Sequence, residues 1–364
     1  MIIFTSICAN YLHKARTLAK SIKENIPDAT FIVCLLENEH LPNFDYDGFD
    51  EIVLAKDAWG EGFDSFIFKH AIVEASTAVK GHFFQYLQSR FPDNEMFLYL
   101  DPDIYVYSDF TELKDVLKEH PIVLCPHLLQ PGNIDMEISS MAHGTFNLGF
   151  LAVDNSGEAR EFISWWADRL SRFCYDDIAR GIFTDQKWVD LAPCFFDTFI
   201  FKHRGYDFGT WSLLDSGMTN ENGEIFIKGH PLRFIHFSGF PGTIEMCMRN
   251  WLPEGPHPFR NLFEEYAQIH NANNLDEISK TTWSYDTYSS GEKIDNDVRI
   301  NYREKIYHFP SDYNPFLLSN DELRKTLAQI DRPEPAGYFG KARRILRDEG
   351  FSALMQKTRR KLFR

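Results

Sequence analysis

The residues Met96-Phe97-Leu98-Tyr99-Leu100-Asp101-Pro102-Asp103 form an apolar run that ends in two carboxylates. A short run of this kind is typical of a buried strand. Pro102 has no N–H to donate and favours extended geometry at Asp101, so we expect strand pairing to stop where the acids emerge. Two carboxylates at a strand exit can hold Mg2+ or Mn2+, which prefer oxygen ligands and often share them with substrate phosphates. A solvated turn explains Asp-x-Asp taken alone equally well.

Strand and helix patterns alternate on both sides of this run. Apolar runs predict strands at 1–8, 30–36, 52–55, 96–100 and 121–125. Helical spacing predicts helices at 11–25, 67–90 and 159–173. The polar stretch 130–143 has turn residues at its start and is predicted to be a mobile loop. Alternating strands and helices indicate an α/β fold, in which ligands bind beyond the carboxyl ends of parallel strands.

Composition and charge exclude several classes of protein. The chain has 364 residues, 44% of them apolar, and is long enough to bury a sizeable site. A net charge of −15 argues against a nucleic-acid partner. The start, Met1-Ile2-Ile3-Phe4, lacks a basic secretory region, and no apolar stretch has the length of a spanning helix. The six cysteines are scattered, so we expect reduced cysteines and a cytoplasmic protein.

Five later residues are candidates for a site. Asn147 and Gly149 interrupt an apolar run, and a glycine there marks close approach of a ligand or backbone, or an ordinary bulge. Asp185 and Gln186 lie at a predicted helix start. His236 ends the apolar strand pattern of residues 234–236, where a histidine is more often structural than a ligand. The Rossmann and P-loop glycine motifs are both missing, so a nucleotide would be held in another way.

In their order and spacing, the segments 98–103, 146–150, 185–186 and 236–239 resemble nucleotide-sugar glycosyltransferases of the GT-A fold. The resemblance is closest to family 8-like enzymes and related bacterial surface-polysaccharide transferases, and covers roughly residues 1–240. It implies a Rossmann-like, mixed and mostly parallel sheet flanked by helices, with a small C-terminal extension and a helical tail. The expected domains are a GT-A catalytic domain at 1–245, an accessory or acceptor-side region at 246–335 and a tail at 336–364.

The resemblance also implies roles for the matching residues. The expected metal ligands are Asp101, Asp103 and His236, with Mn2+ or Mg2+ as the cofactor. The expected contacts to the nucleotide-sugar donor are Thr5, Ser6, Ala9, Asn10, Tyr11, Lys80, Asp101, Asn147 and Gly149. Asp185 and Gln186 match the catalytic pair that faces the sugar hydroxyls and the reacting anomeric carbon.

One residue departs from the family pattern. The lysine that usually follows the histidine motif and contacts the diphosphate is missing after residues 236–239. The cations that could replace it are Lys80, Arg233 and Arg249. The sequence does not choose among them.

The implied function is a metal-dependent hexosyltransferase. It would move a sugar from a nucleotide diphosphate, UDP by default, to a glycan or lipid-linked acceptor in bacterial cell-surface polysaccharide synthesis. A retaining reaction is implied, in which Gln186 or Asp185 stabilises the developing positive carbon. In an inverting reaction, Asp185 would be the general base.

The C-terminal segments complete the predictions. Residues 283–292 predict a hairpin with a Ser-Gly turn. Residues 338–364 alternate apolar and basic residues, which is typical of amphipathic helices on an anionic membrane surface. A solvated basic tail or a partner-binding helix is the alternative.

Two other functions stay open. HAD-type phosphatases also use Asp-x-Asp, normally after the first strand, and have Thr or Val where Tyr105 stands here. A protein of the same fold could also bind nucleotide or sugar without catalysis.

Overall fold

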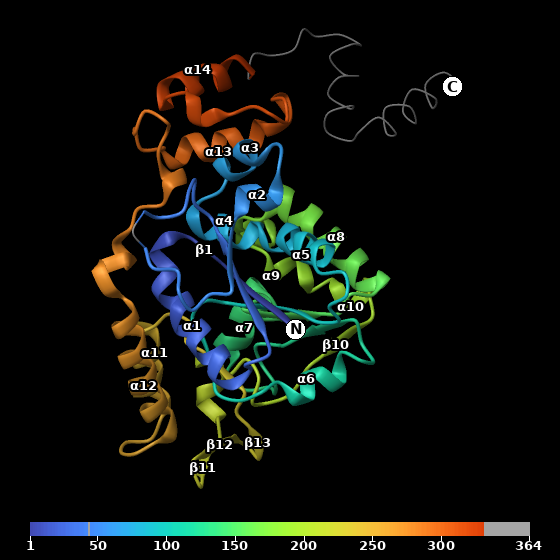
Figure 1. Ribbon diagram of the computed structural model, residues 1–364, viewed down its shortest axis with the longest axis vertical. Coiled ribbons are helices and arrows are strands. Elements are labelled where there is room, and N and C mark those ends of the chain that lie inside the picture. Colours follow the sequence, from blue (N-terminus) through green and yellow to red (C-terminus); the bar gives the residue numbers. More distant parts are fainter. Residues whose placement is uncertain (43, 331–364) are drawn as a thin grey trace. The chain divides into compact units, whose positions relative to one another are not determined.

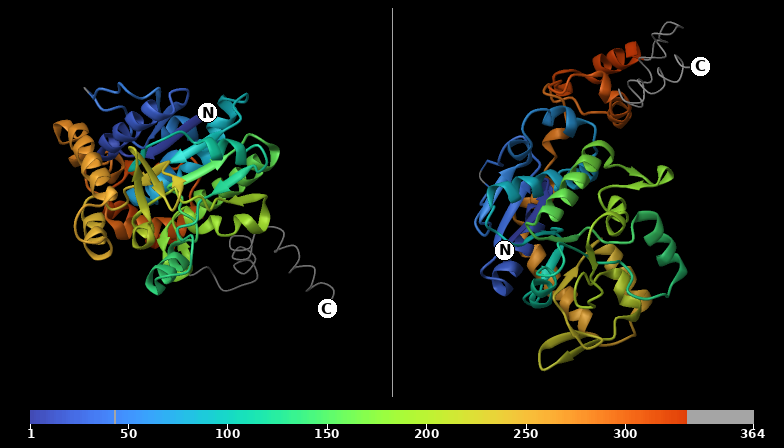
Figure 2. Two further views of the ribbon diagram at one scale, coloured as in Figure 1. Left: turned by 90° about the horizontal axis from the view of Figure 1, so that it is seen from below. Right: turned by 90° about the vertical axis from the view of Figure 1, so that its right-hand side faces the viewer.

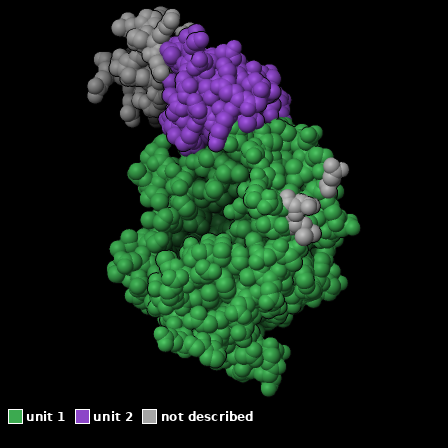
Figure 3. Space-filling view, turned by 90° about the vertical axis from the view of Figure 1, so that its left-hand side faces the viewer, with its two compact units in different colours: residues 1–60, 70–286 green, residues 61–69, 287–364 purple. Residues whose placement is uncertain are grey.

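The computed structural model describes residues 1–42 and 44–330 of the chain, which form two compact units (Figure 3). Unit 1 comprises residues 1–60 and 70–286, and unit 2 comprises residues 61–69 and the chain from residue 287 onward. The predicted tail at 336–364 lies outside the described residues. The predicted division at residue 245 concerns donor and acceptor roles, and it stays a prediction.

Fourteen strands are described. They are β1 (Ile2–Ile7), β2 (Thr30–Leu35), β3 (Glu51–Leu54), β4 (Phe97–Leu100), β5 (Ile104–Val106), β6 (Ile122–Leu124), β7 (Phe150–Val153), β8 (Asp176–Asp177), β9 (Ile182–Phe183), β10 (Thr198–Ile200), β11 (Met218–Glu221), β12 (Glu224–Ile227), β13 (His230–Pro231) and β14 (Phe234–His236). The apolar runs that predicted strands at 1–8, 30–36, 52–55, 96–100 and 121–125 correspond to β1, β2, β3, β4 and β6.

The helices alternate with these strands in the first half of the chain. The α-helices are α1 (Leu12–Asn25), α2 (Ala55–Trp59), α3 (Phe63–Phe68), α4 (Ile72–Ala78), α5 (Lys80–Arg90), α6 (Thr111–Val116), α7 (Ile134–His143), α8 (Gly157–Phe173), α9 (Gln186–Val189), α10 (Ala192–Phe195), α11 (Gly242–Trp251), α12 (Pro258–Asn273), α13 (Asn296–Lys305) and α14 (Asn320–Ile330). The 3-10 helices are η1 (Ala9–Tyr11), η2 (Ile178–Arg180), η3 (Thr210–Asp215), η4 (Leu275–Lys280), η5 (Ser284–Asp286), η6 (Ile306–His308) and η7 (Pro315–Leu317).

Unit 1 is built on a seven-stranded sheet with the order β10-β6-β7-β4-β1-β2-β3. Strand β1 lies inside this sheet and β10 at its edge, and both are labelled in Figure 1. Neighbouring strands run parallel except at β7, which is antiparallel to both β4 and β6. The predicted fold class, a mixed and mostly parallel α/β sheet flanked by helices, is therefore confirmed. The carboxyl ends of β1 and β4 meet at one edge, because these strands are parallel neighbours.

Helices cover both faces of this sheet (Figure 2). Successive strand residues point to opposite faces, so Ile3 of β1 joins a core with Leu18 of α1, whereas Phe4 packs on Phe83 of α5. Leu113 of α6 belongs to the same core as Leu18. The helices α5 and α8 pack on each other on the opposite face.

Two element predictions were wrong. The helix predicted at 67–90 is divided into α3, α4 and α5, and the chain passes from unit 2 to unit 1 between α3 and α4. The start of α4 is stabilised by Glu74, whose carboxylate accepts the Ala71 N–H at 2.9 Å. The predicted loop at 130–143 instead contains α7, because Asn133 caps its start by accepting the N–H groups of Asp135 and Met136.

The predicted hairpin at 283–292 also differs from the structure. Its first residues form η5, and its pairing is reduced to one antiparallel bridge between Thr287 and Lys293. Unit 2 is held together by contacts such as that between the hydroxyls of Ser65 and Tyr302, 2.7 Å apart. Among the described residues, no helix combines the length and apolar character needed to cross a bilayer.

Candidate active site

The two acids of the Asp-x-Asp motif emerge directly after β4. The Asp101 N–H donates to the carbonyl of Gly149, which precedes β7, at 2.8 Å. The carbonyl of Asp103 accepts the N–H of Phe237, just after β14, at 2.8 Å. The acids therefore lie at a strand exit between two other chain segments, as the sequence predicted.

His236 reaches the acids through a separate two-stranded sheet. β14 is antiparallel to β5 and sets His236 opposite Ile104, the residue that follows Asp103. The imidazole Nε2 lies 3.1 Å from Asp103 Oδ1 and 3.6 Å from Asp101 Oδ2. One ligand atom from each of these three residues lies within 4.8 Å of the others. The tertiary structure thus brings together the three residues that the sequence nominated as metal ligands.

The chemistry of this group fits a divalent cation. Two carboxylates and one imidazole are ligands that Mn2+ accepts, and three protein ligands leave room for phosphate oxygens. On the far side of the imidazole, Nδ1 lies 3.7 Å from Asp207 Oδ1, which is an ion-pair distance and longer than a hydrogen bond. A carboxylate behind a metal-binding histidine orients the ring and raises its basicity. Asp207 is 3% exposed, and neither of its oxygens has a hydrogen-bond partner among the described residues.

Gly149 makes room for the His236 ring. A Cβ at position 149 would lie 2.6 Å from His236 Nδ1 and 2.8 Å from Asn147 Oδ1, which are both too close for a side chain. The Asn147 side chain accepts the Gly149 N–H at 2.6 Å and fixes this turn. The sequence left open a close approach of a ligand or backbone to Gly149 or an ordinary bulge, and the close neighbour in the structure is the His236 side chain.

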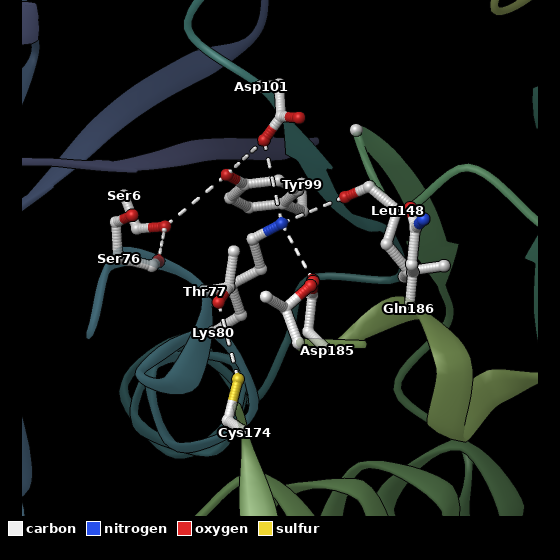
Figure 4. A network of polar contacts seen from close by, with 12 residues as sticks. Ser6, Ser76, Thr77, Lys80, Tyr99, Asp101, Leu148, Cys174, Asp185 and Gln186 are labelled. Carbon is white, nitrogen blue, oxygen red and sulfur yellow. Dashed lines mark hydrogen bonds and ion pairs between the residues drawn. The ribbon is translucent and has the colours of Figure 1, made fainter. Parts of the chain in front are cut away.

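The side chain of Lys80 lies between the carboxylates of Asp101 and Asp185 (Figure 4). Its Nζ lies 2.8 Å from Asp185 Oδ2, 3.0 Å from the carbonyl oxygen of Leu148 and 3.5 Å from Asp101 Oδ1. The Tyr99 hydroxyl donates to Asp101 at 2.6 Å, and the ammonium also lies over the Tyr99 ring. Burial alone would lower the pKa of Lys80, but the charges of Asp101 and Asp185 outweigh burial and raise it. Lys80 is therefore a buried cation whose charge is balanced by the two carboxylates.

The charges around His236 stabilise one another. Burial alone would raise the pKa of Asp103, but the charges of Lys14 and His236 hold it well below its usual value. Burial alone would lower the pKa of His236, and the Asp103 carboxylate instead raises it to about 10. Burial raises the pKa of Asp207 to about 6, although His236 opposes the rise. The ionised forms of these groups therefore depend on their charged neighbours.

A cavity of about 470 Å³ opens above these residues, a volume suited to a small-molecule ligand. The predicted site residues that line it are Ser6, Asn10, Tyr11, Asp101, Asp103, Asn147, Gln186 and His236. The predicted residues Thr5, Ala9, Lys80, Gly149 and Asp185 are buried and do not form part of the lining. The cavity therefore joins the exits of β1 and β4 with β14 and the start of α9.

Asp185 and Gln186 occupy different positions although they are adjacent. Asp185 is 3% exposed, and its backbone carbonyl accepts the Trp166 indole N–H at 3.1 Å. Burial raises the pKa of the Asp185 carboxyl, and Lys80 opposes the rise. Gln186 begins α9 as predicted, and its side-chain amide donates to the carbonyl of His143 at 3.0 Å. Of the two, Gln186 faces the cavity.

Sequence reasoning missed Lys14 and Asp207, which both contact the candidate metal ligands. Lys14 Nζ lies 3.4 Å from Asp103 Oδ2. A signal for Lys14 was available, because it follows Tyr11 by three residues and so lies on the same side of the predicted helix. Asp207 lies outside every predicted element, and only its position between Tyr206 and Phe208 hinted at burial.

The topology does not favour the phosphatase alternative. Asp101 and Asp103 follow β4, whereas the phosphatase interpretation expects the acids after the first strand. The exit of β1 carries Cys8 and Ala9 instead. Neither residue can form the aspartyl nucleophile that such a phosphatase requires.

Comparisons with known proteins give partial similarities. No protein-family model matches the chain. The uncharacterized protein YfnD of Bacillus subtilis (strain 168) is 28% identical over 168 residues, which are 44% of this chain and 52% of that protein. The uncharacterized protein YfnF of the same strain is 25% identical over 172 residues, 44% of this chain and 55% of that protein. The chain thus spans about half the length of the curated relatives it matches.

Solved structures with similar regions are glycosyltransferases. A structure of the galactosyltransferase LgtC in complex with donor and acceptor sugar analogs is 18% identical, covers 75% of this chain and 96% of that chain, and has a TM-score of 0.45. The glycosyltransferase GlyE of Streptococcus pneumoniae TIGR4 is 14% identical, covers 77% of this chain and 65% of that chain, and has a TM-score of 0.40. Because both TM-scores lie below 0.5, we base the function on the geometry of the site.

Proposed function

We propose that the protein is a metal-dependent glycosyltransferase that moves a hexose-type sugar from a nucleotide diphosphate to a glycan or lipid-linked acceptor. The observation that carries this proposal is the group formed by Asp101, Asp103 and His236 beside a cavity at the carboxyl ends of parallel strands. Ligands of open α/β sheets bind at this edge. UDP is the first nucleotide to test, because the sequence resemblance implies it.

The metal ligands would be the two acids and the histidine. Mn2+ or Mg2+ bound by them would supply Lewis-acid charge that stabilises a departing diphosphate. Ser6, Asn10 and Tyr11 line the same cavity near the exit of β1, and we assign them to the nucleotide. The exposed ring of Tyr11, at 40% exposure, offers a stacking surface for the base.

The catalytic pair is divided between two roles in this proposal. Gln186 lines the cavity and would stabilise the positive charge that develops on the anomeric carbon. Asp185 is buried and paired with Lys80, so its charge is already neutralised. A general base must reach the acceptor hydroxyl, and this pairing argues against that role for Asp185. We therefore infer a retaining reaction, in which the leaving phosphate takes the proton of the acceptor.

The remaining roles are assigned to the C-terminal part of the chain. We propose that residues 246–335 contribute to the acceptor side and that residues 336–364 bind an anionic membrane surface. A lipid-linked acceptor at the inner face of a bacterial cell membrane would be within reach of such an enzyme. Synthesis of a cell-surface polysaccharide is the process that this acceptor implies.

The test is metal-dependent hydrolysis and transfer with a panel of nucleotide sugars. The wild-type protein is expected to release one nucleotide slowly with Mn2+ and not with chelator. Asp103→Asn is expected to lower this rate by 100-fold or more, on the order of 3 kcal/mol, because a site that stabilises the leaving group loses a charged ligand. Asp115→Asn is the matched control, because Asp115 forms an exposed pair with Lys118 and does not line the cavity.

The outcome separates the proposal from a binding protein. Nucleotide release that survives in Asp103→Asn, at unchanged metal dependence, would contradict the metal-site assignment. Tight nucleotide binding without any release or transfer would favour a non-catalytic protein. Thermal melting of each variant checks that both substitutions leave a folded protein.

A further inference from the structure

The three cations that the sequence offered for a diphosphate are all engaged or remote. The ammonium of Lys80 donates a hydrogen bond to the Leu148 carbonyl, forms ion pairs with Asp101 and Asp185, and does not line the cavity. Arg233 donates to both carboxylate oxygens of Glu112, at 2.6 and 2.9 Å, and to the Ser108 hydroxyl. Arg249 is exposed on α11, and its side chain has no hydrogen bond or ion pair among the described residues. None of the three presents free donors at the cavity.

Lys14 has the position and the free donors that these cations lack. Its Nζ lies 3.4 Å from Asp103 Oδ2 and 4.2 Å from the centre of the Tyr11 ring. Asp103 is its one hydrogen-bond acceptor within the part of the chain that the structure describes. An ammonium has three donors, so two remain available. Lys14 is not itself a lining residue, but Asp103 and Tyr11, which its ammonium contacts, both line the cavity.

The surroundings of Lys14 strengthen its charge interactions. The side chain is 12% exposed and that of Asp103 is 14% exposed, so solvent and salt screen the pair less than an open surface pair. Four carboxylates, from Asp101, Asp103, Asp185 and Asp207, gather near His236 and Lys80. A polyanionic ligand entering this site would need additional positive charge.

We propose that Lys14 binds the diphosphate of the donor and occupies Asp103 only while no divalent cation does so. Asp103 would be a ligand of a bound divalent cation, so Lys14 would then lose its contact with this carboxylate. The free ammonium would be available to the phosphate oxygens of the donor. This inference rests on the proposed function, because it takes a nucleoside diphosphate as the ligand.

If Lys14 moves from Asp103 to the diphosphate, its removal should have opposite effects on the affinity for Mn2+ alone and on the affinity for UDP. In Lys14→Gln, the affinity for Mn2+ alone should rise by a fewfold, because nothing then competes with the cation for Asp103. The affinity for UDP in the presence of Mn2+ should fall about tenfold or more, because a charge-assisted contact is lost. The affinity for uridine, which carries no phosphate, should not change.

The experiment is titration calorimetry of the full-length protein with Mn2+, with uridine and with UDP plus Mn2+. Lys14→Arg keeps the charge and should recover most of the UDP affinity. Lys20→Gln, on the exposed side of α1, is the matched control and should behave as the wild type. Thermal melting shows whether Lys14→Gln is folded, and Lys14→Met, which keeps the stem, replaces it if it is not.

Three outcomes would overturn the inference. Wild-type affinity of Lys14→Gln for UDP with Mn2+ would remove Lys14 from the phosphate site. Equal losses for uridine and UDP would indicate a structural role for Lys14 in α1. An unchanged or lower Mn2+ affinity would show that the ammonium does not compete for Asp103. If the wild-type protein bound no nucleotide at all, the proposed function itself would fail, and this is separable from the other outcomes.

Discussion

At the scale of single residues, the site contains four aspartates in two environments. Asp101 and Asp103 reach the cavity, whereas Asp185 and Asp207 are almost fully buried behind it. Lys80 neutralises Asp185, and His236 is the charged neighbour of Asp207. Identical side chains are therefore given different tasks by burial and by their partners.

Asp207→Asn is expected to weaken Mn2+ binding. The amide keeps the volume of the side chain but loses the charge behind His236, and removal of such a partner costs about 10- to 100-fold in metal affinity. Titration with Mn2+ alone measures the effect without reliance on catalysis.

A matched control for that variant is Asp197→Asn, at an exposed aspartate that pairs with another histidine, His120. The control should bind Mn2+ as the wild type does. Unchanged Mn2+ affinity in Asp207→Asn would mean that the carboxylate does not support the ligand.

At the scale of elements, helices α1 and α12 meet through two buried histidines. The rings of His13 and His270 lie 4.7 Å apart in an edge-on arrangement. Burial, with His270 as the next cause, lowers the pKa of His13 from 6.5 to about 4. Burial also lowers the pKa of His270. Both rings are therefore held in the neutral form, which packs between the two helices without an unpaired charge.

This pair predicts a loss of stability in mild acid. Between pH 6.5 and 4 the unfolded chain binds a proton at His13 that the folded chain does not, so the free energy of unfolding falls as pH falls. Allowing for partial solvent screening, we expect about 1–2 kcal/mol from this residue. Chemical denaturation at several pH values measures the slope.

His13→Phe isolates the effect, because it keeps an aromatic ring against His270 but cannot be protonated. Carboxylates titrate in the same range, so the quantity to compare is the difference in slope between the variant and the wild type. A variant as sensitive to pH as the wild type would contradict the prediction. Burial also lowers the pKa of His127 to about 4, but this residue is present in both proteins and so contributes equally to both slopes.

At the scale of the whole molecule, charge is distributed very unevenly along the chain. Residues 341–364 contain nine Lys or Arg against two acids, a local charge of +7. The net charge of the whole chain is −15, so the remaining residues together carry a charge of −22. An acidic protein with one basic segment is expected to approach an anionic surface through that segment.

The membrane proposal predicts salt-sensitive binding to vesicles that contain phosphatidylglycerol. Replacement of Lys357, Arg359, Arg360 and Lys361 by glutamine should strongly reduce flotation, because each basic residue near the surface contributes about 1 kcal/mol. Flotation of the full-length chain at low and high salt measures it.

The control replaces four exposed lysines elsewhere, Lys20, Lys114, Lys118 and Lys280, by glutamine. It changes the net charge equally and should float as the wild type does. Equal flotation of the two variants would reject a specific role for the C-terminal segment.

The sequence by itself determined the parts of this protein that depend on short-range pattern. Apolar runs fixed the main strands, Pro102 fixed the strand exit, and Gln186 marked the start of α9. These features depend on neighbours a few residues apart, so local physical chemistry is sufficient to predict them. The loop predicted at 130–143 failed for a local reason, because the capping signal of Asn133 was overlooked.

Only the tertiary structure decided which residues share the site. His236 reaches Asp103 through the register of β14 on β5, and Lys14 reaches the same residue from α1. Asp207 lies behind His236 although it belongs to no predicted element. Contacts between distant segments depend on how sheets and helices pack, and hydrophobic periodicity carries no information about that register. The ligands were therefore predictable one at a time, whereas their partners became visible only when the chain was folded.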